Sequence, residues 1–594
     1  MRLTTLFFSL ALLLLLAFYS PKNEMLSLDR DRSPHDLALT PDGKYALTAN
    51  ATSNSASLVD IAAGGVVQEI TLGDRPFAVA IAAQAPRAII SNYNSNTLSV
   101  LKIESGQMRV EATIEVGAEP RGVALCKDGS KAFVSLAGED AVAVVDIAKR
   151  KVTATIEVGT EPWYLALTPD EKRLAVGNTR SQDVSVIEVA TQKVLHTTKL
   201  RGRNVRQIAI DPQGKWAYVN NVSEQGRPTT PENIDRGWVI ANRLSRIDMT
   251  QDEPREAIAL DTEGNALADI EGTAISPDGK TVLLTAGGSH EVTRLRLPLP
   301  FMSYGGPPDH INGTLQNNPA KFARLLLGER PVSVRFTADG RRAIIADYLQ
   351  NAIHVLDVER MERVKTIALG SAKTPSLARQ GERLFLDGTR SFKQWYSCNS
   401  CHVEGHTNGG TFDTSNDGSY QTTKKTLSLR GATKTAPYTW HGWQKDLKTL
   451  IHDSFRKSMQ GPEPTAEELN AVYAYLETLD WRPNPRAKDP QTAKARMRGE
   501  ALFKAKACDT CHAPPYYTSS NVYTVGLEST EDAYKGYNPP TLLNVGTRSP
   551  YLHDGRSRTL RDVLKNHHRP SKLTGKTDFT DSELTEIVLF LKAL

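Results

Sequence analysis

The sequence predicts a multidomain protein, an all-β propeller of seven blades followed by a mainly α-helical region made of two similar halves. Three observations predict it: a repeated strand pattern through residues 33–370, a helical and polar composition from residue 374 onward, and two Cys-x-x-Cys-His pentapeptides in that second region. The chain has 594 residues. It is therefore long enough for several domains, each with its own core.

Residues 33–370 repeat with a period of about 40 to 45 residues, and each copy holds about four short runs rich in Val, Ile and Thr. Such a period with four strands per copy is typical of a propeller blade, which buries its faces only against its neighbours. A turn of the Pro-Asp-Gly type marks the copies. These turns lie at 41–43, 127–129, 169–171, 212–214, 277–279 and 338–340, with a degenerate copy at 82–88.

The copy KWAYVNN at 215–221, together with ASLVDI and AVAVVDI, resembles the YVTN family of seven-bladed propellers. The resemblance implies a fold and says little about chemistry. Two copies carry long insertions, at 223–243 and 297–324. Such loops either carry functional residues or pack against the helical region. Tyr304 and His310 in the second insertion are candidates to face a cofactor, a partner or solvent, whereas His35, His290 and His354 are best explained as structural.

The two pentapeptides are CNSCH, at Cys398–His402, and CDTCH, at Cys508–His512. Each spaces two thiols to add across the vinyl groups of a haem, and the following His supplies an axial ligand to iron. A zinc site needs four ligands, and a redox dithiol usually lies near a βαβ unit. Both pentapeptides instead follow a helix-like stretch, at 376–385 and 495–507. The sequence therefore predicts two covalently bound c-type haems, held by Cys398, Cys401, Cys508 and Cys511 with His402 and His512 on iron; the fifth cysteine, Cys126, is expected to be a small buried hydrophobe.

The helical region divides into a first haem domain at 374–485 and a second at 490–594, a tandem c-type cytochrome domain. The segments LSLRGATKTAPYTWHGWQKDL (427–447) and PTLLNVGTRSPYLHDGRSRTL (540–560) resemble the motif that surrounds P-Y-x-H-D-G in bacterial di-haem cytochrome c peroxidases and their relatives. The resemblance implies a paired-haem fold with one open haem, a distal Glu and a second, electron-supplying haem. Glu463, Glu467, Glu468 and His553 are weak candidates for a catalytic role, and none matches the family's acid.

The sixth iron ligands are predicted by aligning the halves on Leu447 and Leu560. This alignment offers Met459 to the first haem and either His567 or His568 to the second, with His553 as a further possibility. Met459 is otherwise a core residue, and the His pair otherwise belongs to a solvated loop. A thioether ligand favours a higher potential than a second imidazole.

Several aromatic and His residues remain open to two interpretations. Trp440, Trp443 and Trp481 are candidates for a contact between the haems or for ordinary packing, and His441 lies between the first two. His406 and His452 are expected to be surface or hydrogen-bonded residues rather than ligands.

Residues 1–20 read as a signal peptide or an N-terminal anchor, because an apolar run follows Arg2 and no clean cleavage site is present. The body is therefore expected to be exported, as periplasmic c-type cytochromes are, and to meet a membrane only if this segment is retained. The net charge of +5 includes no basic stripe interleaved with aromatics, which argues against a nucleic-acid partner.

These features predict an exported di-haem c-type oxidoreductase of the cytochrome c peroxidase type, acting with a redox partner protein and with hydrogen peroxide or an oxidisable protein. An alternative is a non-catalytic electron-transfer protein whose propeller docks a partner. A third has the propeller binding a small substrate in its central channel. Open or saturated iron coordination distinguishes the first two.

Overall fold

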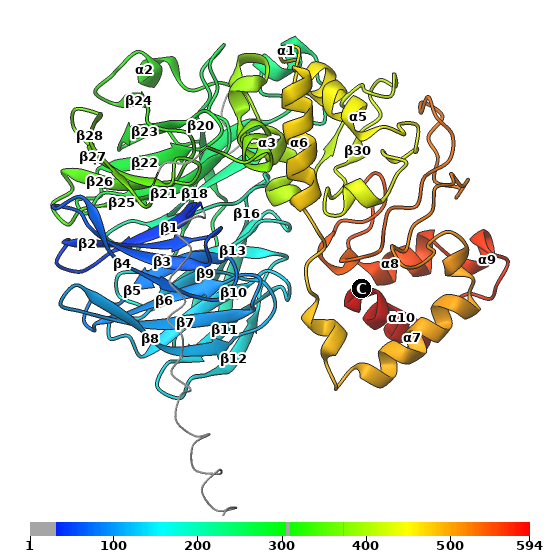
Figure 1. The fold of residues 1–594 in the computed structure, drawn as a ribbon, viewed down its shortest axis with the longest axis horizontal. Coiled ribbons are helices and arrows are strands. Elements are labelled where there is room, and N and C mark those ends of the chain that lie inside the picture. The colour runs from blue at the N-terminus through cyan, green and yellow to red at the C-terminus, as the bar shows by residue number, and fades with distance from the viewer. Residues whose placement is uncertain (1–30, 304–308, 372–373) are drawn as a thin grey trace, which may run out of the picture.

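The computed structural model describes residues 31–303, 309–371 and 374–594 (Figure 1). The predicted leader at 1–20 and Tyr304 lie outside these ranges. A β-propeller forms one side of the molecule, and the helical region lies against one of its faces (Figure 1). Within the described ranges no helix is both long enough and apolar enough to cross a membrane.

The propeller consists of seven four-stranded antiparallel sheets, which confirms the predicted blade number. The first three blades are β1 (Pro34–Leu39), β2 (Tyr45–Asn50), β3 (Ser55–Asp60) and β4 (Gly65–Thr71); β5 (Pro76–Ile81), β6 (Arg87–Asn92), β7 (Thr97–Glu104) and β8 (Gln107–Glu115); β9 (Pro120–Leu125), β10 (Lys131–Leu136), β11 (Ala141–Asp146) and β12 (Lys151–Glu157). The next two are β13 (Pro162–Leu167), β14 (Arg173–Asn178), β15 (Asp183–Glu188) and β16 (Lys193–Lys199); β17 (Ile208–Ile210), β18 (Trp216–Ser223), β19 (Ala241–Asp248) and β20 (Glu256–Ala259). The last two are β21 (Ile270–Ile275), β22 (Thr281–Ala286), β23 (Glu291–Arg296) and β24 (Phe322–Leu326); β25 (Pro331–Phe336), β26 (Arg342–Asp347), β27 (Ala352–Asp357) and β28 (Glu362–Ala368).

Each predicted turn joins the first strand of a blade to the second. In the first blade the Thr40 hydroxyl donates to Asp42 at 2.5 Å, and Gly43 follows with φ +67°, a conformation that glycine adopts without strain. Three other blades repeat this hydroxyl–carboxylate bond. The recurrent Asn at the end of a second strand also has a clear role, since Asn50 donates to the Ser57 hydroxyl of the third strand at 2.8 Å. These buried side-chain bonds repeat with the blade and fix its register.

The ring closes by packing of the innermost strands, with β25 against β1, and among the described residues no strand is shared between the last blade and the first. The Asn351 side chain accepts hydrogen bonds from the Arg32 and Ser33 amides, both at 2.9 Å, and so ties the start of the ring to its last blade. The innermost strands surround a central channel of about 750 Å³. Its polar residues Asp36 and Arg335 pair with each other at 2.9 Å.

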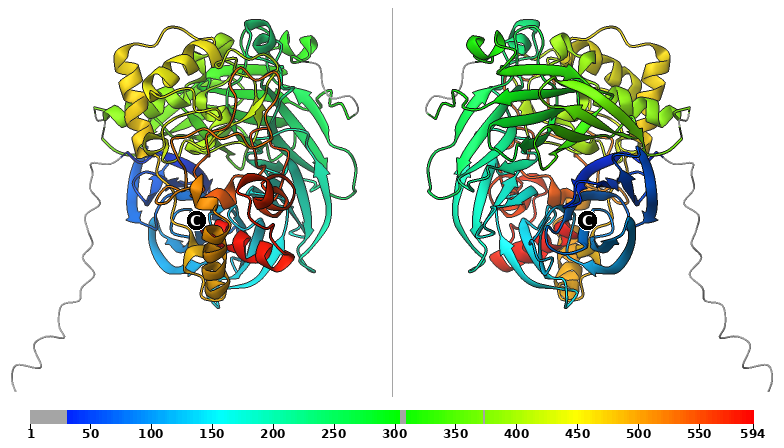
Figure 2. Two further views of the ribbon diagram at one scale, coloured as in Figure 1. Left: turned by 90° about the vertical axis from the view of Figure 1, so that its right-hand side faces the viewer. Right: turned by 90° about the vertical axis from the view of Figure 1, so that its left-hand side faces the viewer.

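The helical region repeats one arrangement twice. Figure 2 shows the yellow helices of the first half above the orange and red helices of the second. In the first half α3 (Leu377–Leu386) precedes the pentapeptide helix α4 (Cys398–Cys401) and packs against the closing helix α6 (Ala466–Thr478). In the second half α7 (Ala493–Ala505) packs against the closing helix α10 (Asp581–Ala593) in the same way. The remaining elements are η1 (Gly388–Arg390), η2 (Phe392–Gln394), η3 (Val403–Gly405), β29 (Thr411–Phe412), β30 (Lys424–Lys425), η4 (Ala432–Lys434), α5 (Leu447–Asp453), η5 (Ser454–Ser458), η6 (Pro485–Lys488), η7 (Cys508–Thr510), η8 (Val545–Thr547), α8 (Leu560–Asp562), η9 (Val563–His567) and α9 (Pro570–Leu573).

Both insertions brace the first half. The first carries α1 (Pro231–Asp235), whose Ile234 joins a buried cluster with Trp395 and Met459 of the helical region. The second carries α2 (Gly313–Gln316), and its His310 ring nitrogen lies 2.6 Å from the Asp235 carbonyl oxygen. The insertions therefore pack against the helical region, which was one of the two roles considered for them.

Candidate haem sites

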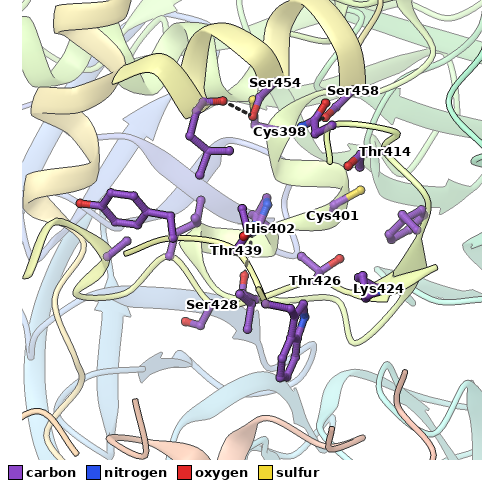
Figure 3. A pocket seen from close by; sticks show the side chains of 18 of the residues that line it. Cys398, Cys401, His402, Thr414, Lys424, Thr426, Ser428, Thr439, Ser454 and Ser458 are labelled. Atoms are coloured by element: carbon purple, nitrogen blue, oxygen red, sulfur yellow. Dashed lines mark hydrogen bonds between the residues drawn. The ribbon is translucent and has the colours of Figure 1, made fainter. Parts of the chain in front are cut away.

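The first Cys-x-x-Cys-His loop borders an enclosed, largely apolar cavity of about 340 Å³. Figure 3 shows Cys398, Cys401 and His402 around this space. Met459, buried at the end of η5, lines the same cavity, with its Sδ 3.7 Å from the Sγ of Cys398. The rest of the wall is mostly apolar and includes Phe385, Tyr396, Leu447, Leu450, Ile451, Phe455, Val472 and Leu476.

The His402 ring is held in one tautomer. Its Nδ1 donates to the Leu427 carbonyl oxygen at 2.9 Å, which leaves Nε2 as the free nitrogen. Burial lowers the pKa of His402 to about 4, so the ring is neutral at pH 7. Two thiols, a neutral imidazole and a thioether on one apolar cavity are the donor set that a c-type haem requires. The residues present therefore fit that group.

The second loop repeats the proximal arrangement. His512 Nδ1 lies 3.1 Å from the Tyr517 carbonyl oxygen, and burial lowers the pKa of His512 to about 4. His568 lies close enough to His512 to feel its charge, and burial followed by that charge lowers the pKa of His568 to about 4. The Nδ1 of His568 is buried and has no hydrogen-bond partner among the described residues. These features favour His568 over His567 as the member of the pair that belongs to the second haem site.

The two halves match at a π-helical turn, which corrects the alignment used above. Met459 follows η5 and His568 follows η9, each bonding back five residues, to the Ser454 carbonyl at 2.9 Å and to the Val563 carbonyl at 2.7 Å. Aligning Leu447 with Leu560 placed the halves out of step because α5 has seven residues where α8 has three. The sequence does carry the better signal: the spacings from proximal His to Met459 and to His568 differ by one residue.

The propeller clamps the first loop directly. Asp269 accepts hydrogen bonds from the hydroxyls of Ser397 and Ser400, at 2.6 and 2.5 Å, so that the residue before the first Cys pair and one residue between its two cysteines are tied to one propeller carboxylate. Asn204 donates to the Ser400 carbonyl oxygen at 2.7 Å. Val403, next to the proximal His, is buried in a hydrophobic cluster of the propeller.

Glu404, two residues after His402, inserts into a group of propeller and linker cations. Its carboxylate lies 3.1 Å from Arg121, 3.6 Å from Arg75 and 3.6 Å from Arg482, and its backbone takes the left-handed conformation with φ +52°. These arginines hold the pKa of Glu404 well below its usual range despite burial. Sequence reasoning missed Glu404 and Asp269, because no local pattern shows that propeller residues so distant in the chain surround this loop.

The glutamates proposed as catalytic lie away from the first cavity. Glu463 is two-thirds exposed and pairs with His452 on the surface. Glu467 is exposed in the first turn of α6, and Glu468 caps that helix and pairs with Arg390 at 2.9 Å. The structure gives each of them a surface or capping role and brings none of them to the cavity wall.

The remaining candidates lie at the seam between the halves or in the blades. Trp481 stacks on Tyr516 at 5.3 Å and packs against Gly431, where an added Cβ would lie 2.2 Å from the ring. The His553 ring stacks on Tyr537 at 4.5 Å, and His441 stacks on the same tyrosine at 4.8 Å. Other residues have simple partners: Trp440 with the Lys425 carbonyl, Trp443 with Tyr534, His406 with Ser428 and the Thr547 carbonyl, His290 with Asp387, His354 with Asp347 and Thr366, and His35 with Phe77; Cys126 is a free thiol in a propeller core.

The structure thus joins a seven-bladed propeller to two helical halves, each with a Cys-x-x-Cys-His loop. The family model "Choice-of-anchor I domain" matches residues 23–192, which covers the first blades.

Parts of the chain are similar to several characterised proteins. The chain is 26% identical over 274 residues to hydrazine synthase subunit gamma of Kuenenia stuttgartiensis, a match covering 37% of this chain and 77% of that protein. It is 23% identical over 289 residues to cytochrome c551 peroxidase of Nitrosomonas europaea, covering 39% and 84%. It is also 29% identical over 118 residues to methylamine utilization protein MauG of Methylorubrum extorquens, covering 16% and 33%. Among solved structures, Kuenenia stuttgartiensis hydrazine synthase aligns with a TM-score of 0.48 and 22% identity, covering 55% of this chain and 96% of that one.

Proposed function

We propose that this protein is an exported di-haem c-type oxidoreductase of the cytochrome c peroxidase type, which passes electrons between two covalently bound haems and a peroxide or a partner protein. One observation carries the proposal: both halves present two thiols and a neutral proximal imidazole on matching elements, with Met459 and His568 at matching π-helical turns. Similarity to a cytochrome peroxidase supports the same class.

A bound haem would supply a reversible one-electron centre at iron. Cys398 and Cys401 would hold the first haem covalently, and His402 would ligate iron through the nitrogen that its bond to Leu427 leaves free. Cys508, Cys511 and His512 would do the same in the second half. Met459 and His568 would then differ in kind, because a thioether favours the reduced iron more than an imidazole does. The first site would therefore have the higher potential.

The seam between the halves supports electron passage within the chain. Trp481 comes from the linker between the halves, packs on Gly431 of the first and stacks on Tyr516 of the second. Trp440 and Trp443 of the first half also contact rings of the second half, His553 and Tyr534 respectively. The apolar run at 1–20 and the c-type motifs support export, to the periplasm or to the outer side of a membrane.

A second candidate is a non-catalytic electron carrier. The observation in its favour is that each proximal His has a residue suited to be a sixth ligand, Met459 on the first cavity and His568 near His512. If both ligands bind iron, peroxide has no vacant position, and the glutamates expected to help cleave it lie elsewhere. Peroxide chemistry then requires one of the two ligands to leave.

Electron paramagnetic resonance of the holoprotein, as isolated and after half-reduction, separates the two functions. A high-spin ferric signal in either state that disappears when peroxide is added supports the peroxidase-type activity. Two low-spin signals that do not respond to peroxide in either state exclude that activity and establish the carrier. A haemochrome assay on the same sample gives the number of haems per chain.

A further inference from the structure

A group of buried cations occupies the seam where the propeller and the two helical halves meet. Lys425 of β30, Arg430 before η4 and Arg548 after η8 have exposed fractions of 6%, 4% and 8%. The first two belong to the first half and the third belongs to the second half. Three cations at one buried seam need anions beside them, because an unpaired buried charge costs several kcal/mol.

Within the described residues no carboxylate forms an ion pair with any of the three, although Glu119 lies near enough to Arg430 for that charge to lower the pKa of Glu119. The side chains of Lys425 and Arg430 take part in no hydrogen bond or ion pair there. The Arg548 guanidinium donates only to the backbone carbonyls of Thr541 and Leu543, and its Nε has no partner. Neutral carbonyls orient a guanidinium but do not neutralise it.

The neighbouring charges make the deficit larger. Two propeller arginines face Lys425, and each already has its own glutamate: Arg180 with Glu161 at 2.7 Å and Arg203 with Glu224 at 2.6 Å. Burial and then the charges of Arg180, Arg548 and Arg203 hold the pKa of Lys425 well below its usual range. Burial and then Arg430 lower the pKa of Arg548 to about 10 and that of Arg482 to about 9. The seam therefore holds a positive potential that its own carboxylates do not balance.

The positions of Lys425 and Arg548 indicate which kind of anion would balance their positive charge. Lys425 and Arg548 both line the first cavity, which also holds Cys398, Cys401 and His402. Most of that cavity is apolar, so a small hydrated anion would leave the apolar wall uncovered. A haem has a flat apolar body and two carboxylates on one edge, which matches a largely apolar cavity whose wall includes these two cations.

We propose that Lys425 and Arg548, with Arg430 adding to their potential, bind the carboxylates of the haem in the first cavity, an inference that rests on the proposed function. The two cations come from different halves of the chain, Lys425 from the first and Arg548 from the second. One haem would thereby hold the seam together, and its carboxylates would be neutralised by protein charge.

The test measures whether the melting temperature and the reduction potential of the holoprotein rise or fall when Lys425 is replaced by a neutral residue. With haem carboxylates at the seam, Lys425→Met leaves a negative charge unbalanced, so the reduction potential of the first haem falls and the melting temperature falls. Without an anion, the same substitution removes repulsion among buried cations, and the melting temperature rises. The potential falls in both cases because a positive charge beside the cavity is lost, so the direction of the melting-temperature change decides. Lys425→Arg keeps the charge and is expected to restore both values.

Lys445→Met is the matched control, because Lys445 is an exposed cation of the same half and its loss should change neither value. If Lys425→Met does not accumulate, Lys425→Gln compared with Lys425→Arg gives the same two readings. A melting temperature that rises, or a potential equal to that of the parent, overturns the proposal.

Free anions are tested separately by adding formate or phosphate to the parent holoprotein. A saturable shift of the first-haem potential would mean that the cations are open to solution anions, which also overturns the assignment to haem carboxylates. The haemochrome assay distinguishes failure of the proposed function from failure of this inference. A chain without haem contradicts the proposed function, whereas a haem-loaded Lys425→Met variant whose melting temperature rises contradicts only this inference.

Discussion

The two helical halves share one framework but have different surroundings. Both place a proximal His against a backbone carbonyl and a second candidate ligand after a π-helical turn. The first loop is held from outside, by Asp269 and by the arginines around Glu404. In the second loop the hydrogen bonds stay inside its own half, for example from the Tyr523 hydroxyl to the Thr510 carbonyl. The duplicated arrangement thus sets where the candidate iron ligands lie in both halves. Contacts with the propeller distinguish the first half from the second.

This difference changes the role expected of the propeller. A docking module would contact the helical region through a modest, exchangeable surface. Here Val403 is part of a propeller core and Glu404 is part of an ion-pair group built on propeller arginines. The propeller is therefore a structural part of the first site, whatever else it binds on its other surfaces.

The largest effect should come from removing either pair of attachment cysteines. Cys398→Ala with Cys401→Ala should lower the haem content and also destabilise the chain, because the cavity of about 340 Å³ loses its filling at a three-domain contact. Cys508→Ala with Cys511→Ala should lower the haem content equally and leave the propeller contact intact. Haemochrome assays and thermal unfolding check this; equal destabilisation by the two double variants would show that the halves are not distinguished by the propeller.

Exchange of the sixth ligands should change one haem at a time. Met459→His gives the first site two imidazoles, so its potential should fall toward that of the second. His568→Leu should convert the second haem from low spin to high spin, whereas His567→Leu, its adjacent control, should leave the spectrum unchanged. Redox titration and paramagnetic resonance give the readings. A response to His567→Leu rather than His568→Leu would contradict the match of the two π-helical turns.

Glu404→Gln should destabilise the protein by about 3–5 kcal/mol, the usual cost of removing one partner from a buried ion pair. It leaves Arg121 and Arg75 without their shared carboxylate. The exposed Glu463→Gln is the control, with an expected cost below about 1 kcal/mol. Denaturant unfolding measures both. Similar values for the two variants would mean that the propeller clamp adds little to stability.

The smallest effect concerns pH. Burial lowers the pKa of His553 from 6.5 to about 4, so the folded protein keeps this ring neutral while the unfolded chain takes up a proton below pH 6.5. The stability it contributes is present above pH 6.5 and is lost as the pH falls toward 4, by at most about 3 kcal/mol. His553→Gln should flatten the melting temperature over that range. A profile as steep as that of the parent would assign the acid sensitivity to other groups.

Much of the architecture was predictable from local patterns. The blade number followed from turns such as 41–43, because hydroxyl–carboxylate and Asn–hydroxyl bonds within a blade impose a local signature that repeats. The two Cys-x-x-Cys-His loops were equally visible, since attachment chemistry fixes their spacing. These features depend on residues close together in the sequence.

The partners of the first loop could not be predicted, because they depend on long-range packing. Asp269 and Arg121 read as ordinary blade residues, and only the docked fold places them around Ser397 and Glu404. The choice between His567 and His568 was open for a different reason: a π-helical turn shifts the helix by one residue, and no composition signal marks it. The glutamates after Met459 lie close to it in sequence, yet Glu467 and Glu468 belong to α6 and Glu463 to the exposed segment before it, and none of them lines the cavity.

The clamp on the first loop also implies an order of assembly. Haem attachment needs both thiols of Cys398 and Cys401 to be reachable, yet Asn399, Ser400 and Val403 are buried once the loop has docked. We therefore expect maturation to load the first haem before the loop closes onto the propeller, which precedes it in the chain and can fold earlier. Limited proteolysis of chains trapped without haem should then cleave near residues 399–405, whereas the mature protein should resist; equal resistance of both would mean that the loop docks first.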